Sequence, residues 1–268
     1  MAKAAFSWLL LGAAACNPNL VDAVQDPLPE PPPVVASPLE TSLLHRYSFE
    51  GDAMLVLDSK GAAHGQLIGA KLAGDGTLPL AGEHTGQYVN LPNGIVSGLT
   101  DATFEAWLTW NGGALWQRIF DFGDSGNGED MPRTDGTSYL FLTTKAAPDT
   151  TLMLPAGLRV AYSQNGVDNE VFCTASMPFP SGVETHVAVV IDHAAKSMAL
   201  YQDGALLRDC TLARPLSAID DVNNWLGHSN YGVDADLGGI YDEFRIYGAA
   251  LSATQIEDSF LAGPDAPH

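Results

Sequence analysis

The sequence predicts an all-β protein that folds as a two-sheet antiparallel β-sandwich with one short C-terminal helical turn. The first observation is strand-like alternation, clearest in 102–110 (ATFEAWLTW), where every second residue from Phe104 to Trp110 is apolar. The second is a pair of turn dipeptides, Asn165-Gly166 and Asp203-Gly204, each set between segments of strand length, as in β-hairpins. The third is composition: 27 Gly and 17 Pro in 268 residues favour many short strands over helices.

The expected strands follow one another closely from residue 43 onward. The most apolar of them, 185–192 (THVAVVID), is expected in the middle of a sheet. After the last strand, Ser252 can cap a helical turn at 253–261. The other expected strands are 43–50, 86–91, 118–123, 138–143, 158–163, 225–229 and 240–247, with a hairpin at 201–207 and a short element at 55–67.

The last of these strands, 240–247 (IYDEFRIY), contains one residue that conflicts with its pattern. Strict alternation puts Ile240, Asp242, Phe244 and Ile246 on one face, which we expect to be the core face. An unpaired carboxylate in a core is costly. We therefore expect Asp242 to have a partner charge, a set of backbone N–H donors or a bound cation.

The C-terminal stretch resembles the closing strand of laminin-G-like jelly rolls, a branch of the concanavalin A-like lectin/glucanase superfamily. This resemblance extends from HRYSFE (45–50) to YDEFRIYGAALS (241–252), and it implies a jelly roll whose first and last strands lie side by side. The residues that match the family pattern are Gly239, Tyr241, Asp242, Glu243, Arg245, Ile246, Tyr247, Ala250, Leu251, Ser252 and Ile256.

The resemblance also implies a structural calcium ion, since members of the superfamily often bind one near the paired terminal strands. Carboxylates of the first strand, the following loop and the closing strand suit a hard cation that prefers oxygen ligands. The alternative is that Asp242 pairs with Arg46 or caps a turn while the other carboxylates are solvated. The predicted ligands are Glu50, Asp52, Asp58 and Asp242.

Aromatic residues at strand ends and in loops are the candidates for ligand binding. Aromatic faces beside amides and carboxylates suit sugar rings, whose C–H faces stack while their hydroxyls form hydrogen bonds. The alternative for each residue is ordinary packing. The predicted ligand-binding residues are Trp116, Asn224, Trp225, His228 and Tyr231.

The N-terminus has the features of a secretory signal peptide, residues 1–15. Lys3 precedes an apolar run that is too short to span a membrane, followed by small residues. The small residues before Cys16 resemble a bacterial lipobox, which implies lipidation of Cys16 and a place at the outer membrane or cell surface. The alternative is an ordinary signal peptide cut near Ala15. Residues 16–41, rich in Pro and acidic side chains, are then expected to be an extended tether, 42–263 the domain and 264–268 a tail.

Cys173 and Cys210 remain as an even pair in an oxidising compartment, so we expect a disulfide between them. Both lie in expected strands. Two cysteines without clustered histidines argue against a zinc site.

The charge and the motifs limit the possible functions. With 12 basic against 32 acidic residues, the chain lacks the basic footprint of a nucleic-acid-binding protein. The paired acids E-x-D-x-x-E of the superfamily's glycosidases are absent, as are G-x-S-x-G and H-E-x-x-H. We therefore expect a non-catalytic extracellular module that binds a glycan or surface glycoprotein. The alternatives are a protein–protein scaffolding module and a glycoside hydrolase.

Overall fold

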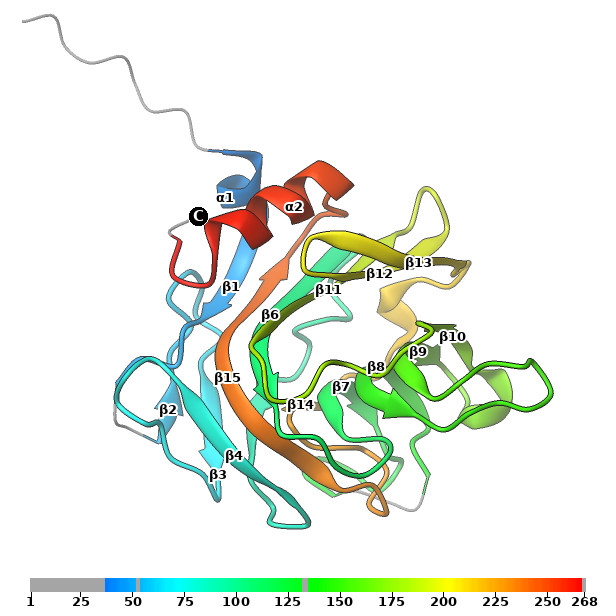
Figure 1. Cartoon of the computed structure of the whole chain (residues 1–268), viewed down its shortest axis with the longest axis horizontal. Coiled ribbons are helices and arrows are strands. Elements are labelled where there is room, and N and C mark those ends of the chain that lie inside the picture. Colours follow the sequence, from blue (N-terminus) through cyan, green and yellow to red (C-terminus); the bar gives the residue numbers. More distant parts are fainter. Residues whose placement is uncertain (1–36, 52–53, 132–134, 267–268) are drawn as a thin grey trace, which may run out of the picture. The chain divides into compact units, whose positions relative to one another are not determined.

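The computed structural model describes residues 37–51, 54–131 and 135–266 (Figure 1). The predicted signal peptide, Cys16, most of the predicted tether and Asp52 lie outside the described residues. The helices are α1 (Pro38–Ser42) and α2 (Ala253–Ala262), with short 3₁₀ turns η1 (Val167–Asn169) and η2 (Leu216–Ala218). The strands are β1 (Leu43–Tyr47), β2 (Leu55–Val56), β3 (Gly65–Ile68), β4 (Leu78–Glu83), β5 (Tyr88–Leu91), β6 (Ala102–Trp110), β7 (Arg118–Asp124), β8 (Ser138–Ala146), β9 (Gly157–Ser163), β10 (Val171–Thr174), β11 (Thr185–Asp192), β12 (Ser197–Gln202), β13 (Ala205–Thr211), β14 (Asn223–Leu226) and β15 (Asp236–Tyr247).

In the described part of the chain the strands form two antiparallel sheets, as predicted. Sheet A has the order β1-β15-β6-β11-β12-β13, with β4 also paired to β15. Sheet B has the order β10-β9-β8-β7-β14-β5-β3-β2. The strand β11 is interior, and β1 pairs with β15, so that Tyr47 lies opposite Phe244. The first and last strands are therefore neighbours, as the sequence resemblance implied.

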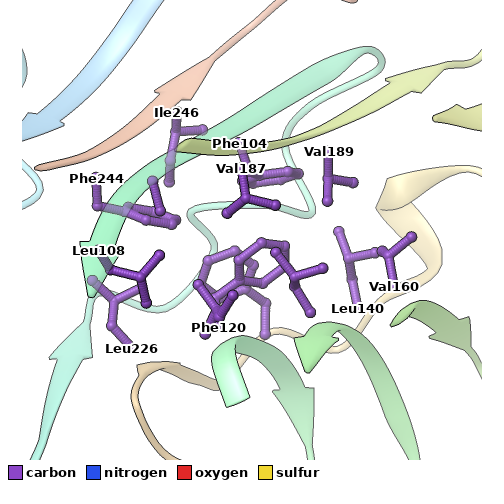
Figure 2. Packing of buried hydrophobic residues seen from close by; sticks show 14 of the residues in the cluster. Phe104, Leu108, Phe120, Leu140, Val160, Val187, Val189, Leu226, Phe244 and Ile246 are labelled. Atoms are coloured by element: carbon purple, nitrogen blue, oxygen red, sulfur yellow. The ribbon is translucent and has the colours of Figure 1, made fainter. Parts of the chain in front are cut away.

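The main hydrophobic core fills the space between the two sheets (Figure 2). From sheet A, Phe104 and Phe244 point toward Phe120 of sheet B, and the ring centroids of Phe104 and Phe120 are 5.3 Å apart. Each of these rings is at most 1% exposed. Full burial of such a side chain stabilises the fold by roughly 1.5–3 kcal/mol, so this layer holds the sandwich together.

A β-bulge at Asp242 overturns the predicted alternation in the closing strand. The pairing of β15 with β6 shifts register between Tyr241 and Glu243, which leaves Asp242 as the extra residue. Tyr241 therefore points into the core and is fully buried, whereas Ile240 lies outside and is 40% exposed. Phe244 is in the core as expected, because the bulge restores the phase after it.

The outer face of sheet A is closed by the two helices, which lie side by side against β1 and β15 (Figure 1). Leu39 of α1 and Ile256 of α2 are buried in one cluster with Tyr247 of β15. Thus residues 38–42, mostly assigned from sequence to a non-packing tether, pack on the domain. Ser252 caps α2 and forms a capping box with Gln255, in agreement with the predicted cap.

Beneath α2 lies a network of buried charges with short hydrogen bonds. Arg245 donates through Nε to Glu243 Oε1 at 2.7 Å, and its guanidinium lies 4.6 Å from the centroid of Trp107. Glu105 accepts at 2.9 Å from the hydroxyl of Tyr247 and at 2.8 Å from that of Ser259 in α2. Arg245 and Glu105 are both 0% exposed. These partners offset the cost of burying the charges.

The two sheets are also joined by the predicted disulfide between Cys173 and Cys210, whose Cα atoms are 5.8 Å apart. It connects β10 with β13, which are the terminal strands of the two sheet orders. Asp203 and Gly204 form the predicted two-residue hairpin turn, with φ of 48° and 76°. Asn165-Gly166 does not form such a turn: β9 and β10 pair, but through a longer loop that contains η1.

No helix among the described residues combines the length and apolar character needed to cross a membrane.

Candidate functional site

The outer face of sheet B carries the candidate site, because alternate residues of its strands point away from the core. In β8, Leu140 and Leu142 enter the core, so Tyr139 and Phe141 lie on the outer face. Strand pairing sets Arg159 of β9 beside Thr143 and Thr174, and Thr143 is in turn opposite Arg118. Two arginines thus share one face of this sheet.

Loops above this face leave a cavity of about 470 Å³. Its walls contain three aromatic rings, which come from β8 and from the loops before β7 and before β15. Five charged residues complete the walls, one of them in the segment 147–150. The aromatic residues are Trp116, Phe141 and Tyr231, and the charged ones are Arg118, Asp149, Arg159, Glu170 and Asp234.

Arg118 is held rigidly at the base of this pocket. It donates to the carbonyl of Trp116 at 2.7 Å and to Asp234 Oδ2 at 2.8 Å, and its Nε is 3.3 Å from Asp121 Oδ2. Its guanidinium also stacks 3.9 Å from the centroid of Phe141. Two carboxylates therefore neutralise this guanidinium, which is 2% exposed.

The loop before β15 is fixed by Asp121, which is fully buried. Its two carboxylate oxygens accept from the backbone N–H and the side-chain amide of Asn230, both at 3.0 Å. Ser229 in the same loop donates to Asp234 at 3.1 Å. These bonds set Tyr231 and Asp234 against the pocket.

A chain of hydroxyl hydrogen bonds leads to Glu170. Tyr231 donates to the hydroxyl of Tyr139 at 3.2 Å, and Tyr139 donates to Glu170 Oε2 at 2.8 Å. Burial raises the pKa of Glu170, although the hydrogen bond from Tyr139 and the charge of Arg159 oppose the increase. Burial likewise raises the pKa of Asp234, opposed by Arg118.

Trp116 reaches the pocket from the segment that joins β6 to β7. Its backbone has φ of 68°, an uncommon conformation for a residue with a side chain. Its N–H donates to the carbonyl of Lys145 at 2.8 Å, while its own carbonyl accepts from Arg118. The neighbouring Gln117 is buried and bonds to Trp110 and to the backbone of Asp236. Hydrogen bonds of Trp116 and of its neighbour Gln117 therefore hold Trp116 in this uncommon backbone conformation.

Of the predicted ligand-binding residues, Trp116 and Tyr231 line the pocket and the other three do not. Trp225 is fully buried, with its ring 4.7 Å from that of His228 and 5.5 Å from that of Tyr88, so the expectation of an exposed aromatic is wrong. Asn224 is also fully buried and donates to the carbonyls of Pro92 and Asp221. His228 stacks on Tyr88 and pairs with Asp236, which ties the loop to its own strands.

Sequence reasoning missed Arg118, Arg159, Glu170 and Asp234. A usable signal was present in 158–163 (LRVAYS): Arg159 interrupts a strand that is otherwise apolar or small, in a chain with only 12 basic residues. Glu170 and Asp234 gave no such signal, because they stand in polar loop sequence far from the arginines.

Among the described residues, the predicted calcium ligands Glu50, Asp58 and Asp242 do not form a group placed to hold a metal ion. Asp58 accepts from the backbone N–H groups of Arg46, Lys60, Gly61 and Ala63, so donors rather than free lone pairs surround it. These bonds and the one to His45 lower its pKa against the raising effect of burial.

Asp242 lies in different surroundings. It lies at the bulge, where burial and the carboxylate of Glu184 raise its pKa to about 7, and Arg46 pairs with Glu243 instead. Among the described residues, which include Glu50 but exclude Asp52, no group of three or more His, Cys, Asp or Glu side chains is placed to hold a metal ion. Because Asp52 lies outside the described residues, calcium binding stays a prediction.

Solved structures with the same fold include two complete modules of similar size. Domain 4 of AbnA, a GH43 extracellular arabinanase from Geobacillus stearothermophilus in complex with arabinotriose, has a TM-score of 0.61 at 19% identity. The match covers 81% of this chain and 97% of that one. The CBM40 of Ruminococcus gnavus IT-sialidase, bound to α2,3-sialyllactose, has a TM-score of 0.53 at 15% identity, with 68% and 95% covered.

A catalytic protein also contains this fold as a part. Trypanosoma rangeli sialidase matches with a TM-score of 0.59 at 14% identity over 83% of this chain, but the match spans only 33% of the sialidase. Identities at this level establish a shared fold. No curated protein matches the chain by sequence.

The sequence itself carries the family assignment. The model of the family Laminin_G_3, described as concanavalin A-like lectin/glucanases superfamily, matches residues 83–257, which is more than half of the chain. This match agrees with the two-sheet architecture and with the adjacency of the first and last strands. The chain belongs to the concanavalin A-like lectin/glucanases superfamily.

Proposed function

We propose that the protein is a non-catalytic glycan-binding module whose pocket on the outer face of sheet B holds a sugar residue. The observation that carries this proposal is the pocket itself: aromatic walls from Trp116, Phe141 and Tyr231 alternate with guanidinium donors and carboxylate acceptors. Sugar rings need both kinds of contact, apolar faces for their C–H groups and hydrogen-bonding partners for their hydroxyls. The neighbouring structures solved with arabinotriose and sialyllactose support this proposal.

The test is a glycan and polysaccharide binding screen of the purified protein, followed by calorimetry with the best ligand. Trp116→Ala should weaken binding at least tenfold, because it removes a wall of the pocket. Tyr88→Ala is the matched control, since Tyr88 is an aromatic of the same sheet that lies outside the pocket lining. Unchanged affinity in Trp116→Ala, or no saturable binding to any glycan, would contradict the proposal and favour a protein–protein scaffolding role.

Glycoside hydrolysis is the second candidate, and one specific observation favours it. Glu170 and Asp234 are two carboxyl groups in one pocket, both with pKa raised by burial, as in general acids. Against it, Asp234 is paired with Arg118, and Glu170 accepts a hydrogen bond from Tyr139. Reducing ends released from a bound polymer, and lost in Glu170→Gln, would establish hydrolysis; a polymer that stays intact would exclude it for that substrate.

We also propose, from the sequence alone, that the chain is exported and lipid-anchored at Cys16 on the outer membrane or cell surface. Mass spectrometry of the mature protein should find a diacylated residue 16 as the new N-terminus. Cys16→Ser should release the protein from the membrane fraction. A mature N-terminus at any other residue would contradict the anchor and leave the pocket proposal intact.

A further inference from the structure

The two arginines of the pocket differ in the number of hydrogen-bond acceptors that surround their guanidinium groups. Arg118 bonds to two carboxylates and one carbonyl. Arg159, on the next strand but one, is 6% exposed, and its Nε donates to the hydroxyl of Thr174 at 2.8 Å. Its nearest carboxylate is Glu170, whose Oε1 lies 3.9 Å from Nη1, too far for a hydrogen bond.

The two terminal nitrogens of Arg159 thus donate to no group among the described residues. They belong to a side chain that lines the pocket, between the ring of Phe172 at 4.1 Å and that of Trp116 at 5.4 Å. These nitrogens are not among the fully buried polar atoms that lack a partner, and the planar fork of the guanidinium matches the two oxygens of a carboxylate. An occupant with a carboxylate would supply the missing acceptors.

We propose that the pocket selects acidic sugars, such as a hexuronic or sialic acid residue, through a bidentate contact between the sugar carboxylate and the terminal nitrogens of Arg159. This inference rests on the proposed glycan-binding function and specifies its ligand class. In the same pose the sugar ring lies against the aromatic walls, and its hydroxyls reach Glu170 and Asp234.

The acidic surroundings of the pocket do not prevent such a contact. Glu170 lies closest, and burial raises its pKa, which lowers the cost of protonating it when a second carboxylate enters. Asp234 is neutralised by Arg118. The net charge of −20 repels anions at long range, but salt screens such repulsion beyond about 8 Å at physiological ionic strength. Added salt should therefore leave binding unchanged or strengthen it.

The experiment compares sugars that differ only in the carboxylate. Calorimetry of the full-length protein uses polygalacturonate and its carboxyl-reduced form, and sialyllactose with lactose. At least one acidic member should bind tenfold or more tightly than its neutral partner. In Arg159→Gln the acidic member should lose more affinity than the neutral one, so that the difference disappears, and Arg159→Lys, which keeps the charge but loses the fork, should be intermediate.

Arg214→Gln is the matched control, because Arg214 does not line the pocket and donates to the backbone carbonyl of Asn169. Equal affinity for acidic and neutral partners, with Trp116→Ala still abolishing binding, would overturn this inference and leave the glycan-binding proposal standing. A preference for the acidic member that survives in Arg159→Gln would also overturn it. Failure of every sugar to bind would overturn both proposals. Thermal unfolding of each variant confirms that it is folded.

Discussion

The outer faces of the two sheets both bury arginines, but they treat them differently. On sheet A, α2 lies over Arg245, which bonds to Glu243, to Ser259 and to the carbonyl of Pro264. On sheet B, the one hydrogen-bond acceptor of Arg159 among the described residues is the hydroxyl of Thr174 in β10. Arg245 thus has carboxylate, hydroxyl and carbonyl acceptors without a ligand, whereas Arg159 has unused donors beside a cavity.

This difference separates a structural use of charge from a binding one. A buried ion pair with all its partners holds neighbouring elements in place but leaves nothing to recognise. An arginine with unused donors does not stabilise the fold through them. These donors form hydrogen bonds only when a ligand supplies the acceptors. Substitution of Arg245 on sheet A should therefore lower the stability of the fold, whereas substitution of Arg159 on sheet B should mainly change ligand binding.

The largest loss of stability is expected for Arg245→Met. This change leaves Glu243 and Glu105 buried with fewer counter-charges, which should cost about 3–5 kcal/mol. Urea unfolding measures the loss, and hydrogen exchange should show that α2 opens first. Arg208→Met, at an exposed site on β13, is the control and should cost less than about 1 kcal/mol. Equal losses in the two variants would contradict a structural role for the Arg245 network.

Removal of the disulfide should come next. The double change Cys173→Ser and Cys210→Ser should cost about 3–4 kcal/mol, the value for a loop of this length. Because Cys173 lies between Phe172 and Thr174, both of which contact Arg159, the loss should loosen the pocket face first. Hydrogen exchange should rise more in β9 and β10 than in β1 and β15; a uniform rise would argue against this coupling.

A smaller and pH-dependent effect is expected at Asp242. Its pKa rises from 3.8 to about 7 on folding, so its contribution to stability is fully present below about pH 3.8 and is lost as the pH rises through 7. Asp242→Asn should therefore be more stable than the native protein at pH 8, with a higher unfolding temperature. The gain in free energy of unfolding should be no more than about 1 kcal/mol, because the side chain is partly exposed to solvent. The difference should vanish near pH 3.5.

Glu184→Gln is the matched variant for Asp242, since it removes the partner charge. It should give a similar gain at pH 8. A gain that is independent of pH in either variant would show that the two carboxyl groups do not repel each other.

The smallest effect on stability is expected for Arg159→Gln, less than about 1 kcal/mol in either direction. The side chain has no hydrogen-bonded carboxylate, and Glu170 can take up a proton when its positive neighbour is lost. Urea unfolding of Arg159→Gln beside Arg245→Met gives the comparison directly. If Arg159→Gln lowers the free energy of unfolding by 3 kcal/mol or more, Arg159 has a structural role like that of Arg245.

Local patterns in the sequence predicted most of the fold. The alternation in 102–110, the Asp203-Gly204 turn and the cysteine pair each depend on neighbouring residues or on a simple count, and all three are confirmed. The closing strand was predicted correctly as a strand and in the facing of Phe244 and Ile246, but wrongly in the facing of its residues before the bulge. An alternation of period two cannot reveal an extra residue such as Asp242, because a bulge depends on the partner strand.

The site was predicted less well, for a related reason. Trp116 and Tyr231 were found by their residue type, but type alone could not separate them from Trp225, which the loop around His228 covers. The bonds from backbone N–H groups to Asp58 could not be predicted, because such donors are present at every sequence position and give no compositional signal. The acids and arginines of the pocket come from distant segments, so only the folded sheet brings them together.

The position of β15 affects the order in which the protein can assemble. This strand pairs with β1, β4 and β6, yet ribosomes make it after all of them. During synthesis those three strands have free edges, which are prone to pair with other chains. Sheet A therefore closes only when nearly the whole domain has been translated, and a nascent chain stalled before residue 236 should remain a substrate for chaperones.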